Sequence, residues 1–155
     1  MAPKWFQNLK WTELQLVVCV AIFLPLTSAR SQAGKIAHIV GGKPNTWSVR
    51  ADPDFYQNWA FNERFIVGDK LVFLMEYNMT TPYLYEHSVI QFNDNKAFLR
   101  CDPNGGMDLT EGLEADTPTS VIVDLHSPGI FYYGCSKHDY CTHGQKFFIK
   151  VGSGE

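Results

Sequence analysis

The chain has 155 residues, a length that suits one globular domain with a single hydrophobic core. Hydrophobic residues make up 45% of the chain, which is too large a share for an intrinsically disordered protein. The formal net charge is −3 and no run of Lys and Arg is present, so the composition argues against nucleic acid as a partner.

Residues 1–33 have the three parts of a secretory signal peptide. Lys4 and Lys10 give a basic start, residues 17–26 form a short apolar centre, and small residues follow, so we expect cleavage after Ala29 or Ala33. The alternative is a membrane anchor, but this apolar run contains a proline and is too short to span a hydrocarbon core of about 30 Å. Cleavage after Ala33 would leave 10 basic and 15 acidic residues, a net charge of about −5.

Residues 34–152 are predicted to form one domain, followed by a short tail at 153–155. Short runs rich in β-branched and aromatic residues alternate there with Gly, Pro and Asn turns, a pattern typical of an all-β sandwich or barrel. One short helix is expected over 54–62, where Phe55, Trp59 and Phe61 share an apolar side. No hydrophobic tail of the kind that directs GPI anchoring is present, so we expect no lipid anchor. The predicted strands are 36–40, 65–67, 71–77, 88–92, 97–99, 120–125, 130–133 and 147–151.

Removal of the predicted signal peptide would leave an odd number of cysteines. Cys19 leaves with that peptide, whereas Cys101, Cys135 and Cys141 stay in the mature chain. In an oxidising compartment two of these three cysteines should form a disulfide. The third should remain a free thiol with a specific role.

A series of motifs runs from His38 to Val151 in a fixed order. They are Val40-Gly41-Gly42, Trp47, Phe55-Tyr56-x-x-Trp59-Ala60, Phe65-x-Val67-Gly68-Asp69-x-Leu71-Val72-Phe73, His87-Ser88-Val89, Cys101, Pro128-Gly129-x-x-Tyr132-Tyr133-x-Cys135 and Cys141-x-x-Gly144-Gln145-Lys146-x-x-Ile149-x-Val151. In this order and spacing they resemble the phytocyanins, the plant cupredoxins that include stellacyanins, plantacyanins, uclacyanins and early nodulin-like proteins. The resemblance implies a cupredoxin-like Greek-key β-sandwich or barrel of two sheets with one or two short helices. It also implies a blue copper ion held by two His, a Cys thiolate and a weak axial Met or Gln.

Carried over residue by residue, the copper ligands match incompletely. His87 corresponds to the first His, Cys135 to the thiolate and Gln145 to the axial ligand of stellacyanin-type members. The second His should directly precede the disulfide cysteine, and this chain has Tyr140 there. A phenol, with an ordinary pKa near 10, is a poor copper ligand at neutral pH. We therefore expect no bound cofactor, with copper as the alternative if the site is completed in another way.

His138 is the residue that could complete the site. Its spacing from Cys135 resembles the Cys-x-x-His of plastocyanins, with His143 at the axial position, so a site of His87, Cys135 and His138 rivals the incomplete one. Cys135 is otherwise a buried thiol retained from the family site.

The segment between Asp69 and His87 is longer than the family usually has, which makes the match of His87 less secure. This segment holds Asn78, in the sequon Asn78-Met79-Thr80, which predicts an N-glycan. The resemblance further implies a disulfide between Cys101 and Cys141.

His38 and His126 have no motif around them and are expected to be structural or exposed to solvent. Taken together, these features predict a secreted, non-enzymatic protein of the plant cell surface or wall that binds a wall or surface partner. A small blue-copper electron carrier with a redox partner is the alternative. A nucleophile–base pair, a phosphate loop and a catalytic carboxylate pair are not found in the sequence.

Overall fold

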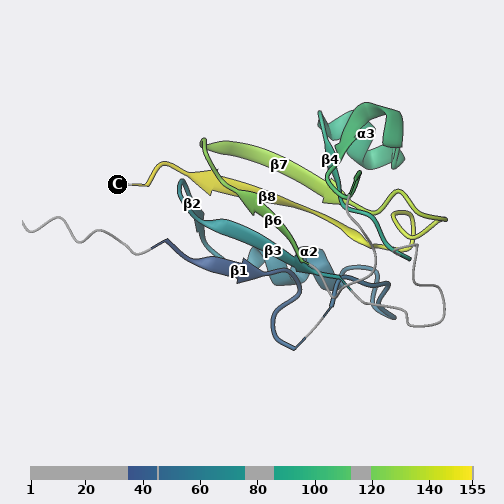
Figure 1. Cartoon of the computed structure of the whole chain (residues 1–155), viewed down its shortest axis with the longest axis horizontal. Coiled ribbons are helices and arrows are strands. Elements are labelled where there is room, and N and C mark those ends of the chain that lie inside the picture. The colour runs from purple at the N-terminus through teal and green to yellow at the C-terminus, as the bar shows by residue number, and fades with distance from the viewer. Residues whose placement is uncertain (1–34, 45, 76–85, 113–119, 155) are drawn as a thin grey trace, which may run out of the picture. The chain divides into compact units, whose positions relative to one another are not determined.

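The computed structural model describes residues 35–44, 46–75, 86–112 and 120–154. These residues form two β-sheets, shown with α2 and α3 in Figure 1. The first sheet has the order β1-β3-β6 and the second the order β2-β8-β7-β4-β5. The predicted all-β class with short helices is thereby confirmed. The elements are β1 (Ala37–Ile39), α2 (Phe55–Phe61), β2 (Phe65–Ile66), β3 (Lys70–Leu74), β4 (Ile90–Phe92), α3 (Asn95–Arg100), the 3-10 turn η2 (Pro103–Gly105), β5 (Gly106–Asp108), β6 (Ser120–Asp124), β7 (Gly129–Gly134) and β8 (Lys146–Gly152).

The core lies between the two sheets and follows from the two-residue period of the strands. β1 runs parallel to β3 and β2 parallel to β8, whereas the other pairs are antiparallel. Alternate side chains of β3 and β8 therefore point inward and are buried. Trp47 joins this core, where its indole donates a hydrogen bond to the Ser88 carbonyl at 2.8 Å. The buried apolar side chains of the core include Leu71, Phe73, Val121, Tyr133, Phe147, Ile149 and Val151.

The helix predicted over 54–62 is present as α2, and it completes the edge of β8. β2 pairs only with the last residues of β8, so the backbone of Phe148 needs other partners on that side. Gln57 supplies both: its amide NH₂ donates to the Phe148 carbonyl at 3.2 Å, and its amide oxygen accepts from the Phe148 N–H at 3.0 Å. Phe55 and Trp59 pack against the core as expected, whereas Phe61 is 67% exposed.

The strand predicted at 97–99 is wrong, because these residues belong to helix α3. Asp94 begins the helix: its carboxylate accepts a hydrogen bond from the Ala97 N–H at 2.8 Å. Cys101 ends it in the left-handed conformation, with φ of 52°. Three apolar residues in a row are compatible with either element, and here the cap decides in favour of the helix.

Strand β5 was not predicted, because Gly106-Met107-Asp108 has little β propensity and gains its structure by pairing with β4. Among the described residues, no helix is long and apolar enough to cross a membrane. The predicted signal peptide and Asn78 lie outside the described residues.

Candidate metal centre

The three family-matched ligands meet at one end of the five-stranded sheet. His87 lies shortly before β4, Cys135 directly follows β7, and Gln145 directly precedes β8, so neighbouring strands position all three. His87 Nδ1 lies 3.1 Å from Gln145 Oε1, and the Cys135 N–H donates to the Gln145 carbonyl at 3.1 Å. All three side chains are buried. The long segment before His87 has therefore not separated this residue from the other two.

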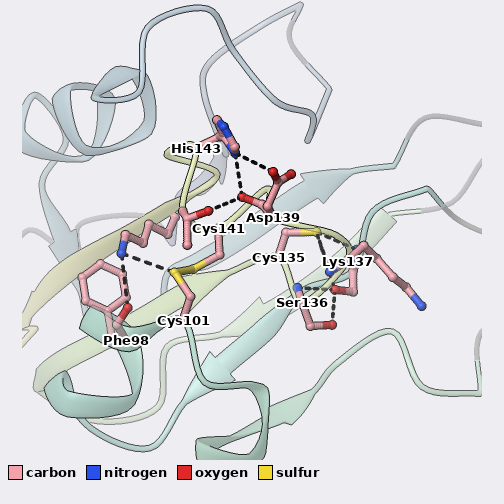
Figure 2. Close-up of a disulfide and its surroundings, with 11 residues drawn as sticks. Phe98, Cys101, Cys135, Ser136, Lys137, Asp139, Cys141 and His143 are labelled. Atoms are coloured by element: carbon pink, nitrogen blue, oxygen red, sulfur yellow. Dashed lines mark hydrogen bonds and ion pairs between the residues drawn. A yellow bond between two sulfur atoms is a disulfide. The ribbon is translucent and has the colours of Figure 1, made fainter.

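The Cys135 thiol is buried and free of any disulfide. The backbone N–H group of Lys137 donates to its sulfur at 3.4 Å (Figure 2). The backbone N–H group of Ser88 donates to the same sulfur, also at 3.4 Å. The Ser88 hydroxyl accepts from the Ser136 N–H at 2.8 Å and lies 2.7 Å from the Ser136 hydroxyl. This network holds the end of β7 to the segment that carries His87. It joins residues far apart in the sequence, and no motif could have revealed it.

Gln145 is completely buried, yet its amide nitrogen has no hydrogen-bond partner among the residues that the structure describes. Leaving a buried donor unsatisfied costs about 1–3 kcal/mol, so such groups are rare in a core. Packing alone therefore does not explain a glutamine at this position. Its amide oxygen, beside His87 Nδ1, lies at the position that the resemblance assigns to the axial ligand.

Tyr140 lies where the family has its second histidine. Its ring centroid is 5.0 Å from that of His87, and its hydroxyl donates to Glu86 Oε1 at 3.2 Å. Partial burial, together with the hydrogen bond to Glu86 and the charge of that carboxylate, raises the pKa of Tyr140 above its ordinary value. The group near His87 is consequently a neutral phenol held by a carboxylate, not an imidazole.

Two positions shortly after Tyr140 hold its loop in place. Cys141 forms a disulfide with Cys101, with 5.8 Å between the Cα atoms (Figure 2). Gly144 has φ of +90°, and a Cβ there would lie 2.1 Å from the Pro53 carbonyl oxygen. Only glycine fits this close approach of two backbones. The position of Tyr140 is therefore well defined by the fold.

His138 does not take the place of the missing ligand. Its side chain is exposed, its φ is 49°, and its ring contacts the Tyr140 ring with 5.0 Å between centroids. Within the part of the chain that the structure describes, no three His, Cys, Asp or Glu side chains are grouped so that they could hold a metal ion. This geometry does not favour a site of His87, Cys135 and His138. His143 is also exposed and lies 3.4 Å from Asp139.

The remaining histidines lie away from this centre. His126 is exposed in the turn between β6 and β7. His38 is buried, with Nε2 3.2 Å from Asp69 Oδ2 and Nδ1 3.0 Å from Glu63 Oε2. These contacts tie β1 to the turn before β3 and to the residues after α2.

Known proteins place this architecture in one family. The model of the plastocyanin-like domain matches residues 47–145. Cucumber peeling cupredoxin from Cucumis sativus is 32% identical over 74% of this chain and 74% of its own length. The chain belongs to the phytocyanins. Early nodulin-like protein 18 of Arabidopsis thaliana is 31% identical over 90% of the chain, and the chain spans 60% of the length of that protein.

Solved phytocyanin structures have the same fold. Cucumber stellacyanin, determined with Cu²⁺, superposes with a TM-score of 0.62 at 31% identity and covers 78% of this chain and 98% of its own. The cucumber basic protein, a blue copper protein, superposes with a TM-score of 0.52 at 22% identity, covering 75% of this chain and 99% of its own, which supports the fold alone.

The residues of this phytocyanin do not fit a blue copper ion. A blue site uses two imidazoles and a thiolate in one plane, with a weak ligand on its axis. His87, Cys135 and Gln145 supply one imidazole, the thiol and the axial amide, and the group at the fourth position is the Tyr140 phenol. One strong donor is therefore missing.

Proposed function

We propose that this phytocyanin is a secreted protein of the plant cell surface or wall that acts by binding a partner, and that it neither transfers electrons nor catalyses a reaction. The observation that carries the proposal is Tyr140 at the position of the second copper imidazole, with its hydroxyl on Glu86. The proposal depends on this observation, because His87, Cys135 and Gln145 match ligands of the copper-binding phytocyanins and do not by themselves argue against copper.

The chemistry of the donors supports the non-redox part of the proposal. Rapid electron transfer at copper needs a ligand set that suits both oxidation states, and imidazole and thiolate do so. A phenolate would favour Cu(II) over Cu(I), and the raised pKa of Tyr140 opposes even its formation. Gln145 is a neutral amide oxygen and cannot replace an imidazole.

The alternative is a blue-copper electron carrier in which His138 serves as the second imidazole. It requires His138 to leave solvent and pass the Tyr140 ring, which His138 now contacts from the exposed side of the loop. It also requires a backbone change, since the disulfide at Cys141 holds the segment after Tyr140.

The copper part of the proposal is tested by adding Cu(II) to the purified wild-type protein. We expect no intense absorption band near ~600 nm, where sulfur-to-copper charge transfer absorbs in blue sites. Cucumber stellacyanin, treated in the same way, is the positive control. A blue wild-type protein that loses its colour in His138→Ala would establish the alternative.

Secretion is supported by the basic, apolar and small-residue parts of residues 1–33. A tagged full-length chain expressed in plant cells should appear in the extracellular fluid without residues 1–29 or 1–33. It should also lose mass on glycosidase treatment if Asn78 carries a glycan. Retention of the tagged chain inside the cells would contradict the proposed secretion.

A further inference from the structure

The outer face of the five-stranded sheet carries a pattern that the metal centre does not use. β7 and β8 pair so that Ile130 lies opposite Lys150, Tyr132 opposite Phe148, and Gly134 opposite Lys146. Successive residues of a strand face opposite sides of the sheet, and the alternating residues Tyr133, Phe147, Ile149 and Val151 are buried. The side chains of Ile130, Tyr132, Lys146, Phe148 and Lys150 therefore point away from the core. With Phe61 from the end of α2, they form a surface that we call the aromatic–lysine strip: Phe61, Ile130, Tyr132, Lys146, Phe148 and Lys150.

The rings of the strip are in contact with one another and remain partly open to solvent. Phe148 is half-buried, and its ring centroid lies 5.8 Å from that of Phe61 and 6.2 Å from that of Tyr132. Tyr132 in turn lies 5.2 Å from Phe98 of α3, which covers one end of the strip. Phe61 and Ile130 are 67% and 52% exposed. Exposed apolar side chains that gather over one sheet face are typical of a binding surface.

The charge of the strip is positive, although the chain as a whole has a net charge of −3. Lys146 and Lys150 are the charged residues of β7 and β8, and among the described residues neither forms an ion pair with a carboxylate. The Lys146 ammonium instead donates to the Phe98 carbonyl at 3.3 Å and to Cys101 Sγ at 3.4 Å, and lies 5.0 Å from the centre of the Phe98 ring. A partly buried cation with neutral partners is one that an anion would stabilise.

We propose that the aromatic–lysine strip binds an acidic polysaccharide of the polyuronate class. Along β8 the outward residues are Lys146, Phe148 and Lys150, a cation, a ring and a cation at a spacing of about 6.6 Å. Each uronate monomer offers the matching chemistry, a carboxylate for a lysine and an apolar pyranose face for an aromatic ring. In the plant this assignment depends on the proposed extracellular location, but binding by the purified protein does not.

Two other occupants fit the strip less well. A second copy of the chain, related by a two-fold axis, would bring the unpaired lysines of one strip against those of the other. An acidic protein segment would neutralise Lys146 and Lys150, but its carboxylates would not by themselves cover Phe61, Tyr132 and Phe148.

The test measures binding of an unesterified oligogalacturonate to the purified protein by titration calorimetry. We expect binding that weakens with added salt and is lost with the fully methyl-esterified oligomer, which keeps the rings but not the charges. Lys150→Glu and Phe61→Ser should each raise Kd by about tenfold or more. The matched controls are Lys137→Glu, an exposed lysine in the loop after β7, and Ile122→Ser, a residue 55% exposed on the other sheet. Both should bind like the wild type.

The outcomes separate this proposal from the one on the copper site. Tyr140→His should bind the oligomer as the wild type does, because Tyr140 is not part of the strip. Absence of binding by the wild type, equal weakening in the control variants, or equal affinity for the esterified oligomer would each overturn the proposal. Tighter binding of a polyglutamate peptide than of the oligogalacturonate would assign the strip to an acidic protein instead.

Discussion

At the scale of single residues, the fold depends on a few positions where one side chain satisfies several neighbours. Asp69 is the clearest: its fully buried carboxylate accepts from the Ile36 N–H at 2.9 Å and the Ile66 N–H at 3.0 Å, and it pairs with His38. One carboxylate thus fixes the approach to β1, the strand β2 and the turn into β3. Removing it would leave two partly buried donors without this acceptor.

Asp69 should make stability depend on pH. Burial opposes the charged form, but the hydrogen bonds from Ile36, Ile66 and His38 outweigh it and lower the pKa of Asp69 below its ordinary value of 3.8. A carboxyl whose pKa is lower in the folded state adds stability above its unfolded pKa, and this stability is lost as the pH falls through the folded pKa. Asp69→Asn should therefore be much less stable than the wild type at neutral pH, and the difference should shrink below pH ~4.

Urea unfolding of both proteins between neutral and acid pH checks this expectation. The control is Asp124→Asn, since Asp124 pairs with Lys70 on the surface and should matter little at any pH. A stability difference for Asp69→Asn that stays constant down to the lowest pH would contradict the assigned role.

Gly144 and Gly112 allow the cost of a positive φ to be compared with the cost of a positive φ combined with a close backbone contact. Both have positive φ, +90° and +79°, but a Cβ on Gly144 would meet Pro53 whereas a Cβ on Gly112 would meet nothing within 4 Å. Gly112→Ala should cost only the conformational strain, about 1 kcal/mol. Gly144→Ala adds a backbone clash and should cost about 3 kcal/mol or more. Equal unfolding free energies for the two variants would show that the contact with Pro53 is not formed.

At the scale of elements, helix α3 shows where local pattern and tertiary structure compete. Its apolar residues include Ala97 and Phe98, which pack on Phe92 and Tyr132 of the sheet, and a strand could present the same residues. The signal for a helix was Asp94, three residues before Ala97, although Asn93-Asp94-Asn95 also reads as a turn. The αL residue after a helix is usually Gly, and here Cys101 takes that conformation.

The cap of α3 can be measured against that of α2. Asp94 and Asp54 both occupy N-cap positions, but the Asp54 side chain makes no cap hydrogen bond. Asp94→Ala should lower the free energy of unfolding by about 1 kcal/mol, and Asp54→Ala by less than about 0.5 kcal/mol. Thermal or urea unfolding gives both values. A loss for Asp54→Ala as large as that for Asp94→Ala would show that the hydrogen bond to Ala97 does not stabilise the helix.

At the scale of the whole molecule, the sequence was most informative where turn residues and ligands stand in a fixed order. That order carried the resemblance to the phytocyanins, which implied the two-sheet fold and pointed to His87, Cys135 and Gln145, three residues that the structure brings together. It could not predict the contact of Tyr140 with Glu86, because that contact depends on how two distant loops meet. The aromatic–lysine strip also escaped it, since Phe61 and Phe148 become neighbours only when α2 packs beside β8.

The central claim is that Tyr140 alone keeps this phytocyanin from forming a blue copper site. Its most direct test is the absorption spectrum of Tyr140→His after addition of Cu(II), beside the wild type and Tyr140→Phe. Tyr140→His supplies the second imidazole next to a backbone that the disulfide already holds, whereas Tyr140→Phe removes the bond to Glu86 and adds no donor. We predict an intense band near ~600 nm for Tyr140→His and none for the other two. A blue wild type, or a colourless Tyr140→His that is folded, would contradict the claim.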